Sequence, residues 1–91
     1  MAKNIIRKIK NRAFALNSET RIEILFLCQN KELTITEIAK KLNLSLNNAS
    51  QNVSVLEREE LVRKTRHKDG TVTVKSLVKI TEDKIEWCFV N

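Results

Sequence analysis

Residues 34–61 read TITEIAKKLNLSLNNASQNVSVLEREEL, and this segment carries the clearest structural pattern of the chain. Thr34 and Glu37 fit the reciprocal capping pattern that starts a helix. Asn43 lies where that helix must end, at a position favouring the left-handed backbone that Asn tolerates, and Ser45 is placed to cap a second helix. The stretch therefore predicts two helices joined by one tight turn. At helical spacing, the apolar set is Ile38, Ala39, Leu42, Leu44, Ala49, Val53 and Leu56.

The second of these helices has an unusual polar face. Opposite its apolar stripe it carries short or medium polar residues and no acid: Asn47, Asn48, Ser50, Gln51 and Ser54. A face that is only solvated usually carries Glu and Lys instead. The pattern favours a binding surface on a helix-turn-helix.

The formal charge of +6 is concentrated in two segments. Residues 1–12 hold five basic and no acidic residues, and residues 61–79 hold six basic residues and one acid. The rest of the chain is slightly acidic. Two basic segments around a near-neutral body favour a polyanionic partner.

The remaining segments follow from hydrophobic spacing. Residues 3–15 predict a helix with basic residues around an apolar stripe, and residues 19–30 predict a nearly all-apolar helix capped by Ser18. Residues 31–34 can add a short edge strand. After Leu61 the spacing becomes two-residue, and Asp69-Gly70 predicts a β-hairpin whose core face holds Val72, Val74, Val78 and Ile80.

One α+β domain, mainly α, is expected over residues 1–91, because one Gly and no Pro leave no flexible linker. Its parts are a basic N-terminal helix (1–17), a helix-turn-helix (34–60), a wing (61–80) and a C-terminal helix (82–90).

The order helix, helix, helix-turn-helix, hairpin, helix is that of a winged helix domain. AFALNSETRIEILFLC at 13–28 resembles a signature in which an Asp-Pro-Thr-Arg element opens a helix, here Ser18-Glu19-Thr20-Arg21. LNLSLNNASQNVSVLEREELV at 42–62 resembles the second helix of the motif leading into the wing. Over residues 13–80 the chain resembles ArsR-type winged helix repressors, with MarR-like and other archaeal or viral winged helix regulators close in pattern. The resemblance implies a homodimer joined by terminal helices, with the recognition helix in the major groove.

On DNA, the recognition helix 46–58 would read bases through its N-terminal half. Asn47 and Gln51 lie one turn apart and can pair with adenine, Ser50 can donate or accept, and Leu46 can touch a thymine methyl. Asn48, Ser54 and Arg58 are better placed for phosphates. The lack of Arg or Lys among the base readers favours an A·T-rich pseudopalindrome.

The wing, residues 63–75, would contact the adjacent minor groove and the phosphates. Arg66, His67 and Lys68 lie beside the turn and suit the negative potential of a narrow minor groove. Arg63, Lys64 and Lys75 are candidate phosphate contacts or solvated cations. The basic first helix can extend along flanking DNA, build a dimer interface, or do both. The expected interface residues are Ile5, Ile9, Leu16, Ile85, Trp87, Cys88 and Phe89.

The chain departs from metal-sensing members of the family. LTITEIA, where the resemblance would place paired cysteines, has none, and TEDKIEWCFVN has no His. One His and two distant cysteines cannot supply four convergent ligands within one chain, so no metal or other cofactor is expected. Cys28 and Cys88 suit packing as small apolar residues. A disulfide between them or across a dimer, giving a redox-responsive regulator, is the alternative.

No catalytic constellation is present in the sequence, so the chain is not expected to be an enzyme. The serious competitor is a winged helix module that binds a protein partner or RNA, although such modules usually have acidic or apolar recognition helices. No run approaches the ~18 apolar residues of a membrane span, and the start has no continuous apolar stretch of a signal peptide. We therefore expect an intracellular, cytoplasmic protein, or one of the host cytoplasm if viral.

Overall fold

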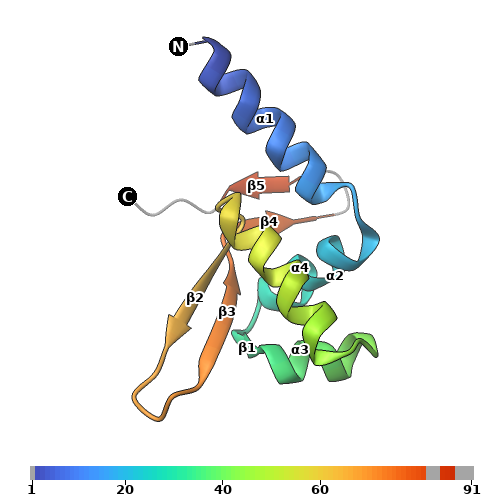
Figure 1. Ribbon diagram of the computed structural model, residues 1–91, viewed down its shortest axis with the longest axis vertical. Helices are drawn as coiled ribbons and strands as arrows, with labels where there is room; N and C mark the ends of the chain where they lie inside the picture. The colour runs from blue at the N-terminus through green and yellow to red at the C-terminus, as the bar shows by residue number, and fades with distance from the viewer. Residues whose placement is uncertain (1, 82–84, 88–91) are drawn as a thin grey trace.

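The computed structural model describes residues 2–81 and 85–87. Its helices are α1 (Ala2–Leu16), α2 (Glu19–Cys28), α3 (Ile35–Leu42) and α4 (Leu46–Arg58). Its strands are β1 (Leu33–Thr34), β2 (Val62–Arg66), β3 (Val72–Ser76), β4 (Val78–Ile80) and β5 (Ile85–Trp87). Helices α2, α3 and α4 pack together, the β2–β3 wing projects from one end, and α1 projects from the other (Figure 1).

Every predicted cap of the helix-turn-helix is confirmed. Thr34 and Glu37 form a complete capping box, with Thr34 N–H donating to Glu37 Oε1 at 2.9 Å and Glu37 N–H donating to Thr34 Oγ1 at 3.1 Å. Asn43 ends α3 at φ 55°, and the Leu44 N–H closes the turn on Ala39 O at 2.8 Å. Ser45 caps α4 by accepting from Asn48 N–H at 3.0 Å. Backbone and cap hydrogen bonds therefore close the turn.

The core forms where these helices meet the inner face of the sheet. Ile38, Ala39, Ala49, Val53 and Leu56 are buried as predicted, and Leu42 and Leu44 pack partly buried against them. The other buried apolar residues are Ala15, Ile24, Leu25, Cys28, Leu33, Leu61, Val62, Val74 and Val78. α4 is thus fixed by a stripe on one side only, which leaves its polar face outward.

The wing belongs to a three-stranded antiparallel sheet in the order β1-β3-β2. The expected edge strand is confirmed as β1, which pairs Leu33 with Val74. The hairpin loop is longer than the two-residue Asp-Gly turn that the sequence predicted. His67 N–H donates to Thr71 O at 2.8 Å, so three residues lie between them, with Gly70 at φ 90°. A three-residue loop with glycine in the left-handed region is the next common hairpin connection.

The second half of the predicted wing strand separates from the wing. The Ser76 hydroxyl donates to Val78 O at 2.6 Å and accepts from Val78 N–H at 3.2 Å, which diverts the chain at Leu77. Beyond this point β4 leaves the wing sheet and pairs with β5 in a second, two-stranded sheet.

The expected C-terminal helix is wrong for residues 85–87, which form strand β5 paired with β4. Residues 82–84 and 88–90 of that predicted helix lie outside the described residues. Strand pairing with Val78–Ile80 supplies backbone partners that the local sequence did not reveal.

Candidate nucleic-acid interface

The polar face of α4 points outward along its whole length. Asn47, Gln51, Ser54 and Arg58 are exposed, and Ser50 is half-buried. Leu46, the first residue of the helix, is 57% exposed although it is apolar. The predicted base-reading residues are therefore held in line on a helix whose other side is core. Their contacts with DNA stay a prediction.

Arg21 links this helix to the end of α1, and the sequence analysis did not single it out as a site residue. Its Nε donates to Ala15 O at 2.6 Å and its Nη2 to Phe14 O at 3.2 Å, so it satisfies carbonyls at the end of α1. Its Nη1 donates to Asn52 Oδ1 at 3.1 Å, and its guanidinium lies over the Phe14 ring, 5.6 Å from the centroid. The only signal in the sequence was its place in the Ser-Glu-Thr-Arg run.

Asn52 connects Arg21 to Asn48 on the exposed face of α4. Its Nδ2 donates to Asn48 O at 3.0 Å and to Asn48 Oδ1 at 2.6 Å. The side-chain oxygen of Asn48 is therefore engaged within α4, and its amide NH₂ is the group left to donate to a phosphate. A second link, from Arg12 Nε to Glu59 O at 3.4 Å, joins α1 to the C-terminal end of α4.

The wing tip presents the predicted cations to solvent. Arg66, His67 and Lys68 are exposed, and His67 Nε2 lies 2.8 Å from Thr73 Oγ1. Asp69 accepts hydrogen bonds from the side chain and backbone N–H of Thr71, which lower the pKa of its carboxyl. The carboxylate thus orders the loop and stays charged beside the cations.

The strand register divides the other wing cations between two faces. Lys64 and Arg66 lie on the side of the buried Val74, whereas Arg63 pairs with Lys75 on the opposite side. Lys64 also pairs with Glu57 Oε1 of α4 at 3.4 Å. The structure therefore brings Lys64 and Arg66 to the side of α4 and places Arg63 and Lys75 on the outer face.

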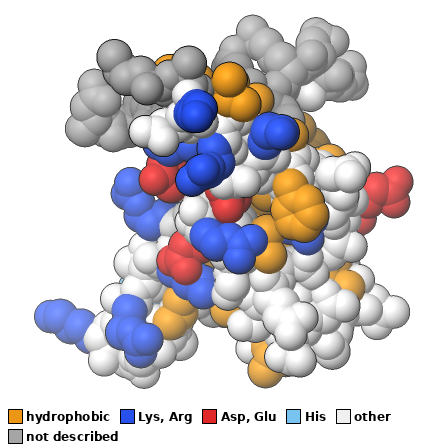
Figure 2. Space-filling view, turned by 45° about the horizontal axis from the view of Figure 1, so that its top comes forward, with side chains coloured by type: hydrophobic (Ala, Val, Ile, Leu, Met, Phe, Trp, Pro, Cys, Tyr) orange, Lys and Arg blue, Asp and Glu red, His pale blue; other side chains and the backbone are white. Residues whose placement is uncertain are grey.

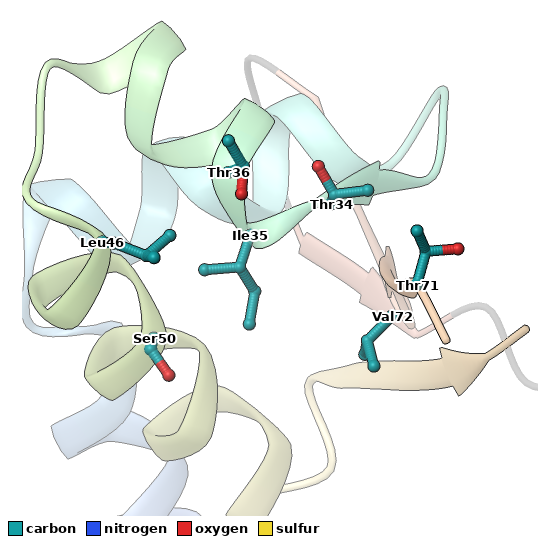
Figure 3. A pocket seen from close by; sticks show the side chains of 7 residues that line it. All are labelled: Thr34, Ile35, Thr36, Leu46, Ser50, Thr71 and Val72. Carbon is teal, nitrogen blue, oxygen red and sulfur yellow. The ribbon is translucent and has the colours of Figure 1, made fainter. Parts of the chain in front are cut away.

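A hollow of about 460 Å³ opens between the start of α3, α4 and the wing. Figure 3 shows Leu46 and Ser50 on one side of it, with Ile35 between them and the wing residue Val72. Its lining residues are Thr34, Ile35, Thr36, Leu46, Ser50, Thr71 and Val72. Among them only Leu46 and Ser50 had been predicted as site residues, because the approach of the wing to α4 is tertiary.

The expected dimer surface is exposed on α1. Ile5 and Ile9 are 59% and 62% exposed, whereas Leu16 packs partly buried against the core. Figure 2 shows exposed hydrophobic side chains among Lys and Arg on the side of the molecule that α1 occupies. Ile85 and Trp87 belong to β5, and Cys88 and Phe89 lie outside the described residues.

Cys28, the last residue of α2, is fully buried. Burial raises the pKa of its thiol to about 11, and the charge of Lys75 acts in the opposite direction. Within residues 2–81 and 85–87, no three His, Cys, Asp or Glu side chains gather as a metal site would need. In the same part of the chain, no helix combines the length and apolar character needed to cross a bilayer.

Comparison with known proteins identifies the class. A sequence profile described as a helix-turn-helix domain matches residues 16–65. HlyU from Vibrio cholerae N16961 is 30% identical, with a TM-score of 0.71 over 84% of this chain and 80% of that chain. NolR from Sinorhizobium fredii is 24% identical, with a TM-score of 0.73 over 82% and 74% of the two chains. The comparison with curated protein sequences gave no match.

A third structure has the same fold at lower identity. The winged helix-turn-helix DNA-binding domain of Mb0332 from Mycobacterium bovis, described as homodimeric and as a possible ArsR-family regulator, is 23% identical. Its TM-score is 0.75 over 81% of this chain and 68% of that chain. The fold and its wing define a winged helix-turn-helix protein. Within that class, the chain belongs to the ArsR-type transcriptional regulators, which are DNA-binding proteins.

Proposed function

We propose that residues 1–91 act as one DNA-binding domain that recognises a specific duplex sequence and controls transcription, as a repressor, by occupying it. The observation that carries this proposal is the outward face of α4, where Asn47 and Gln51 stand exposed on a helix fixed by its buried side and by Arg21. Their amides can pair with adenine in the major groove, and Ser50 can add a hydrogen bond.

The wing supplies the second contact in this proposal. With α4 in the major groove, Arg66, His67 and Lys68 would reach the adjacent minor groove, where A·T tracts carry the most negative potential. The phosphates would be contacted by Asn48, Ser54, Arg58 and Lys64. To do so, Arg58 would leave its ion pair with Glu59, and Lys64 would leave its ion pair with Glu57. Arg63 and Lys75 face away from α4, which supports a role in solvation or in long-range attraction.

A homodimer completes the proposal. The exposed Ile5 and Ile9 on α1 support an interface there, and Mb0332 is described as homodimeric. Two recognition helices spaced ~34–36 Å apart would enter one face of a pseudopalindromic, A·T-rich site. Such a regulator acts where the DNA is, which for a bacterial or archaeal host is the cytoplasm. The proposal needs no cofactor and no catalysis.

Binding experiments test the proposal against its competitor, a winged helix module that binds a protein partner or RNA. Mobility shifts on random duplex, single-stranded DNA and structured RNA, followed by selection of duplexes from a random pool, should give duplex preference and a consensus. Gln51→Ala and Asn47→Ala should each reduce the binding free-energy preference for the consensus over other duplexes by about 1–3 kcal/mol per lost base contact. Asn30→Ala, at an exposed amide outside α4, is the control. Duplex binding no stronger than RNA binding would overturn the proposal.

Salt dependence tests the role of the wing separately. Arg66→Ala and Lys68→Ala should weaken binding to all duplexes and lower the slope of log K against log[salt] by about 1 each, because each variant loses one cation that displaces a condensed counterion from the duplex. Arg63→Ala, on the outer face of the sheet, should change the slope less. If Arg63→Ala lowered the salt slope as much as Arg66→Ala, the assignment of the wing cations to DNA contact would be wrong.

A further inference from the structure

The hollow between α4 and the wing differs chemically from the rest of the proposed interface. Ile35, Leu46 and Val72 give it apolar walls, and the other lining residues are Ser or Thr. No charged side chain lines it. Phosphate contacts are made chiefly by charged and polar donors, whereas base edges also offer apolar groups. The hollow therefore suits the edge of a base.

Leu46 is the side chain that reaches this hollow from the recognition helix. It is the first residue of α4 and 57% exposed, while the buried side of α4 is supplied by other residues. In Figure 3 its side chain points toward Ile35 and into the hollow. The fold does not need a leucine here for packing, so its apolar character is available to a ligand.

Ser50 lies one helical turn after Leu46 on the same side of α4. Residues four apart on a helix are surface neighbours, so the leucine methyls and the serine hydroxyl stand next to each other. Ser50 lines the hollow in Figure 3, and the residue is half-buried there. One turn of helix thus offers an apolar group and a hydrogen-bond donor side by side.

Thymine is the base whose major-groove edge presents the matching pair. It carries a C5-methyl group next to the O4 acceptor, whereas cytosine carries no methyl and presents an N4 donor. We propose that Leu46, backed by Ile35, and Ser50 form a thymine-reading pair at the start of the recognition helix. This inference rests on the proposed function and adds to it a particular base, read chiefly through its methyl group.

Base analogues in duplex DNA test the inference. The selected duplex is prepared with deoxyuridine in place of each thymidine in turn, which removes only the methyl group. At one T·A pair in each half-site the affinity of the wild-type protein should fall about fourfold, the effect of one buried methyl-sized group. A 5-methylcytosine·guanine pair at that position should bind more tightly than cytosine·guanine, because the methyl returns.

Variants assign the methyl contact to Leu46. Leu46→Ala should bind the thymidine and deoxyuridine duplexes equally, and Leu46→Met should keep the difference. Ser50→Ala should weaken binding to both duplexes and leave their ratio unchanged, since both present O4. Phe26→Ala is the matched control, because Phe26 is 53% exposed on α2 and does not line the hollow. Circular dichroism confirms that each variant is folded.

The outcomes separate this inference from the proposed function. If the wild-type protein prefers its selected duplex but binds the deoxyuridine versions equally well, the thymine-reading pair is wrong and DNA recognition stands. The same conclusion follows if Leu46→Ala keeps the wild-type ratio. If the protein shows no preference for any duplex, the proposed function fails and the inference falls with it.

Discussion

Cys28 shows how burial sets the chemistry of a single side chain. The thiol is fully buried and its pKa is raised to about 11, so the thiolate, which is the reactive form, is scarce at neutral pH. In a Cys88→Ser variant we expect Cys28 to react with an aromatic disulfide reagent at pH 8 at least about 100-fold more slowly than in the urea-unfolded chain. Fast labelling of the folded variant would instead support the redox-responsive alternative.

The same shift gives a pH dependence with a defined sign. Because folding raises the pKa of Cys28 from 9.0 to about 11, the neutral thiol's contribution to stability is complete below pH 9. It is lost progressively as the pH rises toward 11. Comparing the wild type with Cys28→Ala over this range should show the difference in unfolding free energy shrinking as the pH rises. A difference that is constant with pH would contradict the raised pKa.

Single residues also show what the sequence could and could not reveal. Asn43 was predicted at the left-handed end of α3 because Asn tolerates that backbone, and it lies there at φ 55°. Glu60 takes the same conformation after α4, at φ 61°, although nothing in a Glu side chain favours it. There the hydrogen bond from Leu61 N–H to Leu56 O and the Arg12–Glu60 ion pair hold the backbone. The hydrogen bond is the local closing bond of the α4 C-terminus, whereas the ion pair comes from the tertiary fold.

At the scale of elements, Arg21 joins three helices. From the first turn of α2, its side chain donates to carbonyls at the end of α1 and to Asn52 of α4, and its backbone N–H donates to the cap residue Ser18. We expect Arg21→Ala to lower the free energy of unfolding by about 1.5–3 kcal/mol, the range for hydrogen bonds to a charged group. Arg21→Lys should recover only part of the loss, because an ammonium cannot reproduce the planar fork.

A double-mutant cycle in urea unfolding isolates the link to α4. Arg21→Ala and Asn52→Ala should be non-additive by about 0.5 kcal/mol or more, as residues in direct contact are. Arg21→Ala combined with Ser54→Ala, an exposed residue farther along α4, is the additive control. Full additivity of the first pair would show that the Arg21–Asn52 bond does not hold α4.

The capping box of α3 predicts an acid dependence of stability. Hydrogen bonds from Thr34 lower the pKa of the Glu37 carboxyl below its ordinary value of 4.5. The stabilisation from the charged form is therefore present above that value and is lost as the pH falls through the lower folded-state pKa. The stability of wild type relative to Glu37→Gln should decline in that window. Glu23→Gln removes an exposed carboxyl in the middle of α2 and is the matched variant.

The elements differ in how far the sequence could predict them. The helix-turn-helix was predictable because its caps, its apolar spacing and its turn all agree within 28 consecutive residues. For the C-terminal segment, Thr81-Glu82-Asp83 led to the prediction of a helix over residues 82–90, and residues 85–87 form strand β5 instead. Pairing of β5 with β4 decided it, and that pairing is tertiary. The hollow was hidden for the same reason, because it forms between α3, α4 and the wing.

At the scale of the whole molecule, α1 and the wing make the protein long, with principal extents of 42 × 27 × 24 Å. Residues 3–10 of α1 are all exposed, and Ile5, Ile6 and Ile9 are each more than half exposed. A 15-residue helix is marginal in water on its own, so most of its stability must come from packing of its apolar face. Among the residues that the structure describes, the core and the side chains packed against it include only Ala15 and Leu16 from α1.

A second copy of the chain supplies the missing contact in our proposal, and charge reversal of the apolar face tests it. Ile5→Glu and Ile9→Glu should convert a dimer into a monomer in analytical ultracentrifugation at micromolar concentration, because a carboxylate is costly to bury in an apolar interface. Asn11→Glu introduces the same charge two residues beyond Ile9, on the opposite side of the helix, and should leave the dimer intact. The monomeric variants should bind one half-site and lose the dependence of affinity on half-site spacing, since that dependence requires two recognition helices held at a fixed distance. A wild-type protein that is monomeric at these concentrations, both free and on DNA, would contradict the dimer. The remaining role for α1 would then be contact with flanking DNA.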